Sequence, residues 1–171
     1  GNKYTFGGGK GLELKQDCFA GSDILSIKDS GKVITNLGTY SFGNCLLLTS
    51  ATLPGVTHSF GNCFYNNYSL TTLKLPKLQE VEGMGYLFYA CSALSSFDLP
   101  LLTTLPGVAN FYNCGSMSSL NLPVCTTLGD TVIDNNNFMS ITGRTIDITI
   151  TPELMTCNSG NPDGDIQTLV A

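Results

Sequence analysis

Residues 88–100 read FYACSALSSFDLP, and three other segments of the chain align with them without gaps. These segments are residues 42–54 (FGNCLLLTSATLP), 64–76 (FYNNYSLTTLKLP) and 111–123 (FYNCGSMSSLNLP). The Phe that opens each segment recurs after 22, 24 and 23 residues, and the connections between segments have nine, eleven and ten residues. Stacked coils need one part of each repeat in register and tolerate insertions in the other, so this pattern predicts a solenoid.

Each segment places apolar residues at fixed offsets of three, three, three and two. In residues 88–100 they are Phe88, Cys91, Leu94, Phe97 and Leu99. The final step of two puts both side chains on one face of a short strand, and the Pro that follows ends the strand because it has no N–H for the ladder. Further apolar positions come two and five residues after each Pro. In the first copy Ser59 interrupts this pattern, and Phe60 is expected to take its place.

The strand pattern Leu-x-x-Leu-x-Leu, with Phe-x-x-Cys before it and Leu-Pro-x-Leu after it, resembles the BspA-like bacterial leucine-rich repeat family. The resemblance covers residues 42–128. The Leu-Pro-x-Leu-x-x-Leu form is also similar to repeats in surface and tail-associated proteins of gut bacteria and their phages. It implies a short, right-handed leucine-rich-repeat solenoid, mainly β and loop, with one parallel β-sheet face, an irregular or short-helical convex side and capped ends. One earlier coil is predicted because the apolar spacing of the repeat recurs approximately at Cys18, Leu25, Ile27, Ile34 and Leu37.

Three regions are expected along the chain. Residues 1–41 form an N-terminal cap with a degenerate first coil, residues 42–129 form the repeat core, and residues 130–171 form a degenerate repeat and C-terminal cap. Within the last region residues 145–150 alternate polar and apolar, which is typical of a half-buried strand, and residues 166–171 suggest another.

The repeated Phe and Cys positions predict the interior of the coils. Phe42, Phe64, Phe88 and Phe111 are expected to form an internal stack. The Cys position holds Cys45, Asn67, Cys91 and Cys114, a small buried ladder that we expect to be reduced, because Asn67 interrupts it and a disulfide needs close geometry. Cys125 stands at an apolar position, while the redox states of Cys63 and Cys157 are left open by the sequence.

Composition and motifs exclude several functions. Only 12% of the residues are charged, the net charge is −5, and the eight basic residues do not cluster, which argues against nucleic-acid binding. A single histidine, His58, excludes a multi-histidine metal site, and no apolar run is long enough to span a membrane. Residues 7–11 (GGGKG) lack the ending of a phosphate loop, and Asp163 and Asp165 fit a turn better than a calcium loop. No catalytic residue, cofactor or metal ligand is predicted.

The outward positions of the strands form a small, hydroxyl-rich surface. They are Ser50, Thr52, Thr72, Lys74, Ser96, Asp98, Ser119 and Asn121. Tyrosines in the connections add residues that build adaptable recognition surfaces. Two explanations remain open for these strand positions, because Ser and Thr also keep stacked coils soluble without the repulsion that repeated charges would cause.

The resemblance implies a non-enzymatic binding or adhesion module outside the cell or at its surface, which recognises a host protein, a glycan or another cell. The alternative is a structural or receptor-binding component of a phage tail or fibre. No signal peptide is visible at residues 1–3, and the sequence leaves the oligomeric state open.

Overall fold

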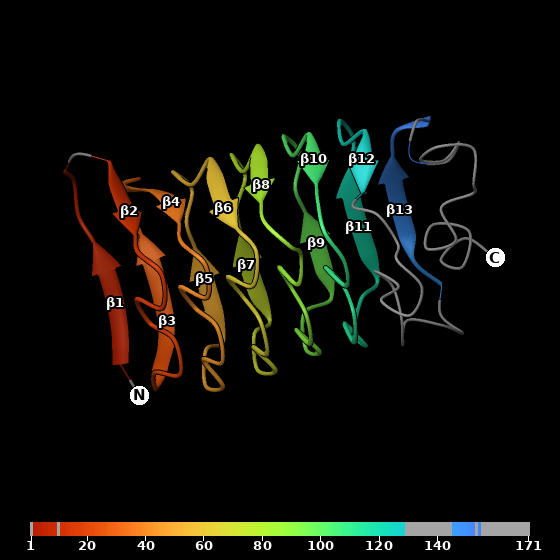
Figure 1. The fold of residues 1–171 in the computed structure, drawn as a ribbon. Helices are drawn as coiled ribbons and strands as arrows, with labels where there is room; N and C mark the ends of the chain where they lie inside the picture. The colour runs from red at the N-terminus through yellow and green to blue at the C-terminus, as the bar shows by residue number, and fades with distance from the viewer. Residues whose placement is uncertain (1, 10, 129–144, 153, 155–171) are drawn as a thin grey trace.

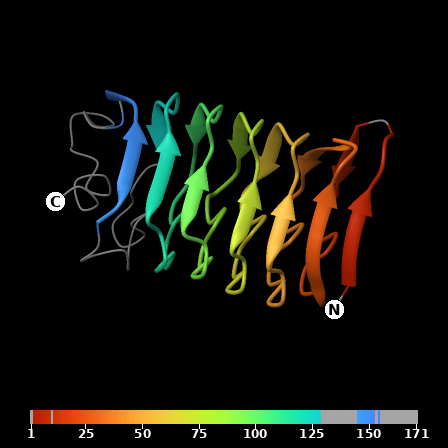
Figure 2. The ribbon, with the colours of Figure 1, turned by 180° about the vertical axis from the view of Figure 1, so that it is seen from behind.

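The computed structural model describes residues 2–9, 11–128, 145–152 and 154, and these residues form a solenoid of stacked coils (Figures 1 and 2). The strands alternate along the chain between two faces. The first face contains β1 (Asn2–Phe6), β3 (Ile24–Asp29), β5 (Ser50–Thr52), β7 (Thr72–Lys74), β9 (Ser96–Asp98), β11 (Ser119–Leu122) and β13 (Asp147–Ile150). The second contains β2 (Leu12–Leu14), β4 (Ile34–Leu37), β6 (His58–Phe60), β8 (Glu80–Glu82), β10 (Thr104–Leu105) and β12 (Thr127–Leu128).

All strand pairs in both faces are parallel, which confirms the predicted repeat solenoid. The second face differs from the expected irregular or short-helical side, because a continuous sheet of β2, β4, β6, β8, β10 and β12 runs along it. Its strands hold only two to four residues, too few for an alternating pattern to appear in the sequence. Coils that are tied together on both faces hold their interior in a fixed register.

The predicted stack of phenylalanines is confirmed. Phe42, Phe64, Phe88 and Phe111 are all fully buried, and their ring centroids lie 5.5, 6.1 and 5.7 Å apart in chain order. Phe19 extends the stack by one coil, 5.3 Å from Phe42. A fully buried Phe contributes about 1.5–3 kcal/mol, so this column is a main source of stability.

The backbone turns sharply around each of these phenylalanines. The residues two before and two after the ring have positive φ in every coil. They are Asp17 and Gly21, Tyr40 and Asn44, Asn62 and Asn66, Tyr86 and Ala90, and Ala109 and Asn113. Asn and Gly are frequent in this left-handed region, which explains why the corners are rich in Asn.

The Cys position supplies a hydrogen-bond donor to the backbone of the preceding coil. In each case the acceptor is the carbonyl of that coil's stacked Phe. The pairs are Cys45 Sγ to Phe19 (3.0 Å), Asn67 Nδ2 to Phe42 (2.9 Å), Cys91 Sγ to Phe64 (3.2 Å) and Cys114 Sγ to Phe88 (3.2 Å). The three cysteines are buried and free, as is Cys125, so the reduced ladder is confirmed. Cys63, which the sequence left open, is also a buried free thiol.

These buried thiols are expected to resist alkylation in the folded protein. Burial raises the pKa of Cys91 from 9.0 to about 12, whereas the Cys18 thiol is exposed. Site-resolved mass spectrometry after iodoacetamide treatment at pH 8 should find Cys18 modified and Cys91 modified only after unfolding; rapid native labelling of Cys91 would contradict the buried ladder. Because folding raises this pKa, the stability that the Cys91 thiol contributes is complete below pH 9 and is lost as the pH rises towards 12.

Two details of the predicted repeat are wrong. Cys18 is exposed, and Phe19 occupies the stacked position of the first coil. Ile27 follows Phe19 by eight residues, whereas its strand partner Ala51 follows Phe42 by nine, and this difference of one residue shifted the apparent register. Phe60 does not replace Ser59 either: Ser59 itself points inward at 2% exposure and donates to Cys63 Sγ (3.1 Å), while Phe60 is 39% exposed.

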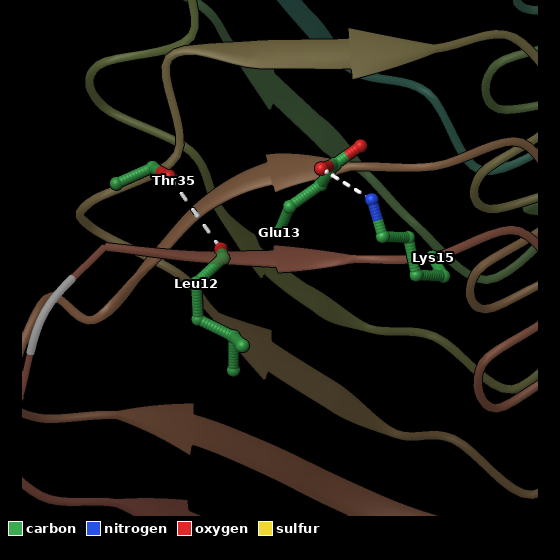
Figure 3. A network of polar contacts seen from close by, with 4 residues as sticks. All are labelled: Leu12, Glu13, Lys15 and Thr35. Carbon is green, nitrogen blue, oxygen red and sulfur yellow. Dashed lines mark hydrogen bonds and ion pairs between the residues drawn. The ribbon is translucent and has the colours of Figure 1, made fainter.

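At the N-terminal end β2 pairs with β4, and Figure 3 shows the contacts at this junction. The Thr35 hydroxyl donates to the Leu12 carbonyl (3.5 Å), and Lys15 Nζ lies 2.7 Å from Glu13 Oε2. The ion pair is largely exposed and therefore contributes little to stability. At the other end β13 forms the predicted half-buried strand, whereas Cys157, Asp163, Asp165 and the strand expected at residues 166–171 lie outside the described residues.

Candidate functional site

The eight predicted binding residues lie on the first face in two rows that run across the strands. Ser50 pairs with Thr72 and Thr52 with Lys74 between β5 and β7; Ser96 pairs with Ser119 and Asp98 with Asn121 between β9 and β11. All eight are exposed or half-exposed. The structure brings them together as two groups of four, because the face consists of two sheets, one ending at β7 and the other at β9.

The hydrogen bonds that join neighbouring coils on this face take one form at three junctions, β3–β5, β5–β7 and β9–β11. The residue before β5, β7 and β11 donates both its N–H and its hydroxyl to one carbonyl of the preceding coil. The pairs, with both distances, are Thr49 to Leu25 (2.9 and 3.0 Å), Thr71 to Thr49 (3.0 and 3.1 Å) and Ser118 to Ser95 (2.8 and 3.0 Å). Ser95 is the equivalent donor before β9, and among the described residues neither of its groups bonds to the Thr71 carbonyl.

The other end of the strands shows the same contrast. The N–H of the residue after the strand donates to a carbonyl of the following coil, in the pairs Leu53 to Lys74 (2.9 Å) and Leu99 to Asn121 (3.0 Å). The matching bond from Leu75 to Asp98 is absent from the part of the chain that the structure describes. The face is therefore open along the whole length of β7 and β9, and we call this junction the β7–β9 break.

The break is confined to one side of the solenoid. On the second face β6, β8 and β10 stay joined, and at the Phe corner the N–H of Phe64 donates to the Leu87 carbonyl (3.0 Å). The separation of β7 from β9 is visible in Figure 2, where the strands on either side lie closer to their own neighbours. Two strand edges thus face each other within a structure that is otherwise continuous.

A hollow of about 430 Å³ lies over the break. Leu73, Leu75 and Leu94 supply its apolar lining, while polar side chains stand on either side: Thr72 and Lys74 on β7, Ser96 and Asp98 on β9. The volume falls in the range of small-ligand pockets, and the mixture of an apolar floor and a few polar groups is typical of them. The Asp98 carboxylate accepts a hydrogen bond from Asn121 Nδ2 (2.7 Å) and so has a fixed position.

Two departures from the repeat coincide with the break. The inward position at the middle of the strand is Ala51, Leu73 and Leu120 in three coils but Phe97 in β9, where the ring packs edge-on against Phe88 (5.4 Å) and Phe111 (5.2 Å). The coil between β7 and β9 is also the longest, with positive φ at Gly83 and Gly85. Sequence analysis missed the break, although these two signals were visible as the 24-residue interval and the aromatic residue in a leucine position.

Amide exchange should reveal the break without any ligand. We expect the N–H groups of Leu75 and Ser95 to exchange at least about 100-fold faster than those of Leu53 and Ser118, their counterparts at intact junctions, because only the latter two are hydrogen-bonded to a neighbouring coil. NMR-detected hydrogen exchange measures all four in one sample. Equal protection at all four positions would show that the ladder is closed in solution.

Comparison with known families agrees with this architecture. A model described as the BspA type leucine rich repeat region matches residues 12–149 in six copies. The chain belongs to the BspA-type leucine-rich repeat family. No curated protein sequence matches it.

One solved structure resembles the BspA-type chain in fold. A T. pallidum leucine-rich repeat protein has a TM-score of 0.58 and 21% identity, over 70% of this chain and 63% of that protein. A leucine-rich repeat protein from Bacteroides ovatus has a TM-score of 0.42 and 16% identity, over 86% of this chain and 54% of that protein. The chain therefore spans less than two thirds of the first of these proteins, and the likeness concerns the fold alone.

The tyrosines of the BspA-type repeats form a second exposed feature at the Phe corner. Tyr65, Tyr89 and Tyr112 stack with centroids 4.8 Å apart, and Tyr40 packs edge-on against Tyr65 at 5.8 Å. Burial, and to a smaller extent the neighbouring Tyr112, raises the pKa of Tyr89. Because these rings cover each other's faces, the stack leaves mainly edges and hydroxyls for contact with a ligand.

Groups that would suggest other chemistry are not seen in the part of the chain that the structure describes. There, no three residues among His, Cys, Asp and Glu gather closely enough to hold a metal ion. The same residues include no helix with the length and hydropathy needed to cross a membrane. His58, the single histidine of the sequence, pairs with Glu80 (2.9 Å) and with the Thr57 hydroxyl (2.9 Å) on the second face.

Proposed function

We propose that this chain is a non-enzymatic binding module that recognises a protein or glycan through its first face, centred on the β7–β9 break. The observation that carries the proposal is the hollow, where four of the eight predicted residues surround an apolar floor. Membership of the BspA-type family supports a repeat scaffold whose exposed face serves binding.

The proposal places the module outside the cell or at its surface, in adhesion to a host protein, a glycan or another cell. This location is supported by the family, whose members are generally surface-associated bacterial proteins. The low charge of the face suits close approach to an uncharged ligand, since few ions need to be desolvated. The arrangement of Thr, Ser, Asn and single charges provides hydrogen bonds that orient such a ligand.

The test uses a glycan array and a panel of purified host extracellular proteins as probes. Changing Lys74, Asp98 and Asn121 together to alanine should weaken any binding found by at least about tenfold, since these side chains border the hollow or hold its rim. The matched control changes His58, Glu80 and Thr104 to alanine, because these residues occupy one row of the second face. Equal binding by parent and first variant, or loss only in the control, would contradict the proposal.

Size-exclusion chromatography with light scattering separates this proposal from a phage-fibre component. A monomer is expected for a surface module. A stable trimer would favour the fibre instead, because fibres are built from closed oligomers of repeated chains.

A further inference from the structure

The two edges of the β7–β9 break present backbone groups in the pattern of a strand that has lost its partner. Along the parallel ladder, alternate residues face each neighbour, and the groups of β7 that face β5 are already bonded. The Thr71 carbonyl, the Leu73 amide and the Leu75 N–H therefore point towards the break. Ser95 and the strand it precedes supply the opposing edge, and no bond among the described residues joins the two.

A ligand that satisfies both edges needs N–H and C=O groups on two sides, repeated every two residues. In a strand that distance is about 6.6 Å, and an extended peptide backbone supplies the groups at this spacing on both sides. A sugar ring offers hydroxyls without this repeat. The geometry of the break therefore selects a peptide strand.

The side chains around the break specify the chemistry of that peptide. Its inward residue would contact Leu73, Leu75 and Leu94, which favours a small or branched apolar side chain. Its outward residue would lie in the row between Lys74 and Asp98, one a donor cation and the other an acceptor carboxylate. An amide or hydroxyl side chain can accept from Lys74 and donate to Asp98, whereas a charged one is repelled from one side. Asn121 already donates to Asp98 in this way.

We propose that the β7–β9 break binds an extended, uncharged peptide segment of a partner protein as an added strand, with the outward–inward–outward pattern hydroxyl, apolar, amide or hydroxyl. The inference rests on the proposed function and names its partner class. Strands of this same pattern, Ser50–Ala51–Thr52 and Ser119–Leu120–Asn121, fill the corresponding places in the intact ladder. No backbone bond has to break for the strand to enter, because none crosses the break among the described residues.

The edges are protected from non-specific pairing by their position. Free strand edges usually promote association with other chains, and proteins shield them with charges or by covering them. Here each edge faces the other, and Lys74 and Asp98 stand beside the opening.

The probes are end-blocked pentapeptides on the pattern of residues 49–53, TSATL, with the central position varied among Ala, Val and Leu. Binding to the full chain is measured by NMR titration, and we expect a Kd below about 1 mM, with shifts at the amides of Leu75 and Ser95. The same peptide with a methylated central amide should bind at least about tenfold more weakly, because it cannot donate to a strand edge. Ser96→Trp, which fills the hollow, should abolish binding.

Thr104→Trp is the matched control, because Thr104 is an exposed residue of β10 on the second face, where the strands stay joined. It should leave peptide affinity within about twofold of the parent. The strand proposal is overturned if no pentapeptide binds, if the methylated peptide binds equally well, or if Thr104→Trp has the larger effect. A saccharide that binds to the parent and is blocked by Ser96→Trp would also overturn the strand proposal, yet it would leave the proposed function standing. Binding that is unaffected by the Lys74, Asp98 and Asn121 changes would overturn the proposed function itself.

Discussion

Replacing Phe88 with alanine is expected to lower the free energy of unfolding by about 3–5 kcal/mol. Phe88 is fully buried and contacts Phe64, Phe97 and Phe111, so its removal leaves a cavity that three other rings border. The rings on either side are held by their own coils, whose backbones are bonded to each other at the Phe corner, so the cavity cannot collapse easily.

Urea unfolding measures this change, and the melting temperature should fall by about 6–20 °C. Phe60→Ala is the control, because Phe60 is the same residue type at 39% exposure in the second face and should cost much less. A melt of the Phe88 variant close to that of the parent would refute the role of the stack. An equally large loss of stability in the Phe60 variant would show that the protein is sensitive to the truncation of any Phe, not of the stacked Phe column in particular.

Asn67→Asp is expected to destabilise the protein by about 3–5 kcal/mol. The Asn67 side chain is fully buried, its Nδ2 donates to the Phe42 carbonyl (2.9 Å), and its Oδ1 has no partner among the described residues. A carboxylate at this position loses the donor and places a negative charge against a carbonyl oxygen. Folding would then require the carboxyl group to be protonated, so the loss should shrink at low pH.

The control for this position is Asn67→Cys, the residue that the other three coils carry. A thiol can donate to the Phe42 carbonyl as Cys91 does to Phe64, and it removes the unpaired Oδ1. We therefore expect this variant to match the parent or to gain about 1 kcal/mol in chemical denaturation. An Asn67→Asp variant as stable as the parent, or a strongly destabilised Asn67→Cys variant, would contradict the proposed donor role.

The solenoid, the Phe column and the Cys ladder follow from spacing alone, because each depends on one side-chain type recurring once per coil. The second sheet does not, since strands as short as Thr104–Leu105 have a single inward residue and give no period. The first coil was placed out of register because it is one residue shorter between its Phe and its strand: nine residues before Ile27, the interval from Phe42 to Ala51, stands Cys18 rather than Phe19. Residue spacing therefore predicts the position of each side chain correctly where the copies have equal length, and it misplaces side chains where one copy is shorter.

The candidate surface was predictable only in part. Alternation placed Thr72, Lys74, Ser96 and Asp98 outward, but their grouping around a hollow depends on hydrogen bonds missing between two coils. That absence coincides with the 24-residue interval and with Phe97, and the sequence contains both signals without indicating how the backbone responds. The binding role of these residues stays a prediction until the variants above are measured.

The one-sided break also gives the solenoid unequal bending stiffness. Bending that spreads the first face at β7 and β9 breaks no backbone hydrogen bond among the described residues, whereas bending that spreads the second face must break those joining β6, β8 and β10. Thermal motion and applied load should therefore flex the molecule mainly about this one coil and in one direction. The solenoid, pulled along its axis, would extend there first, while the coils on either side keep their shape.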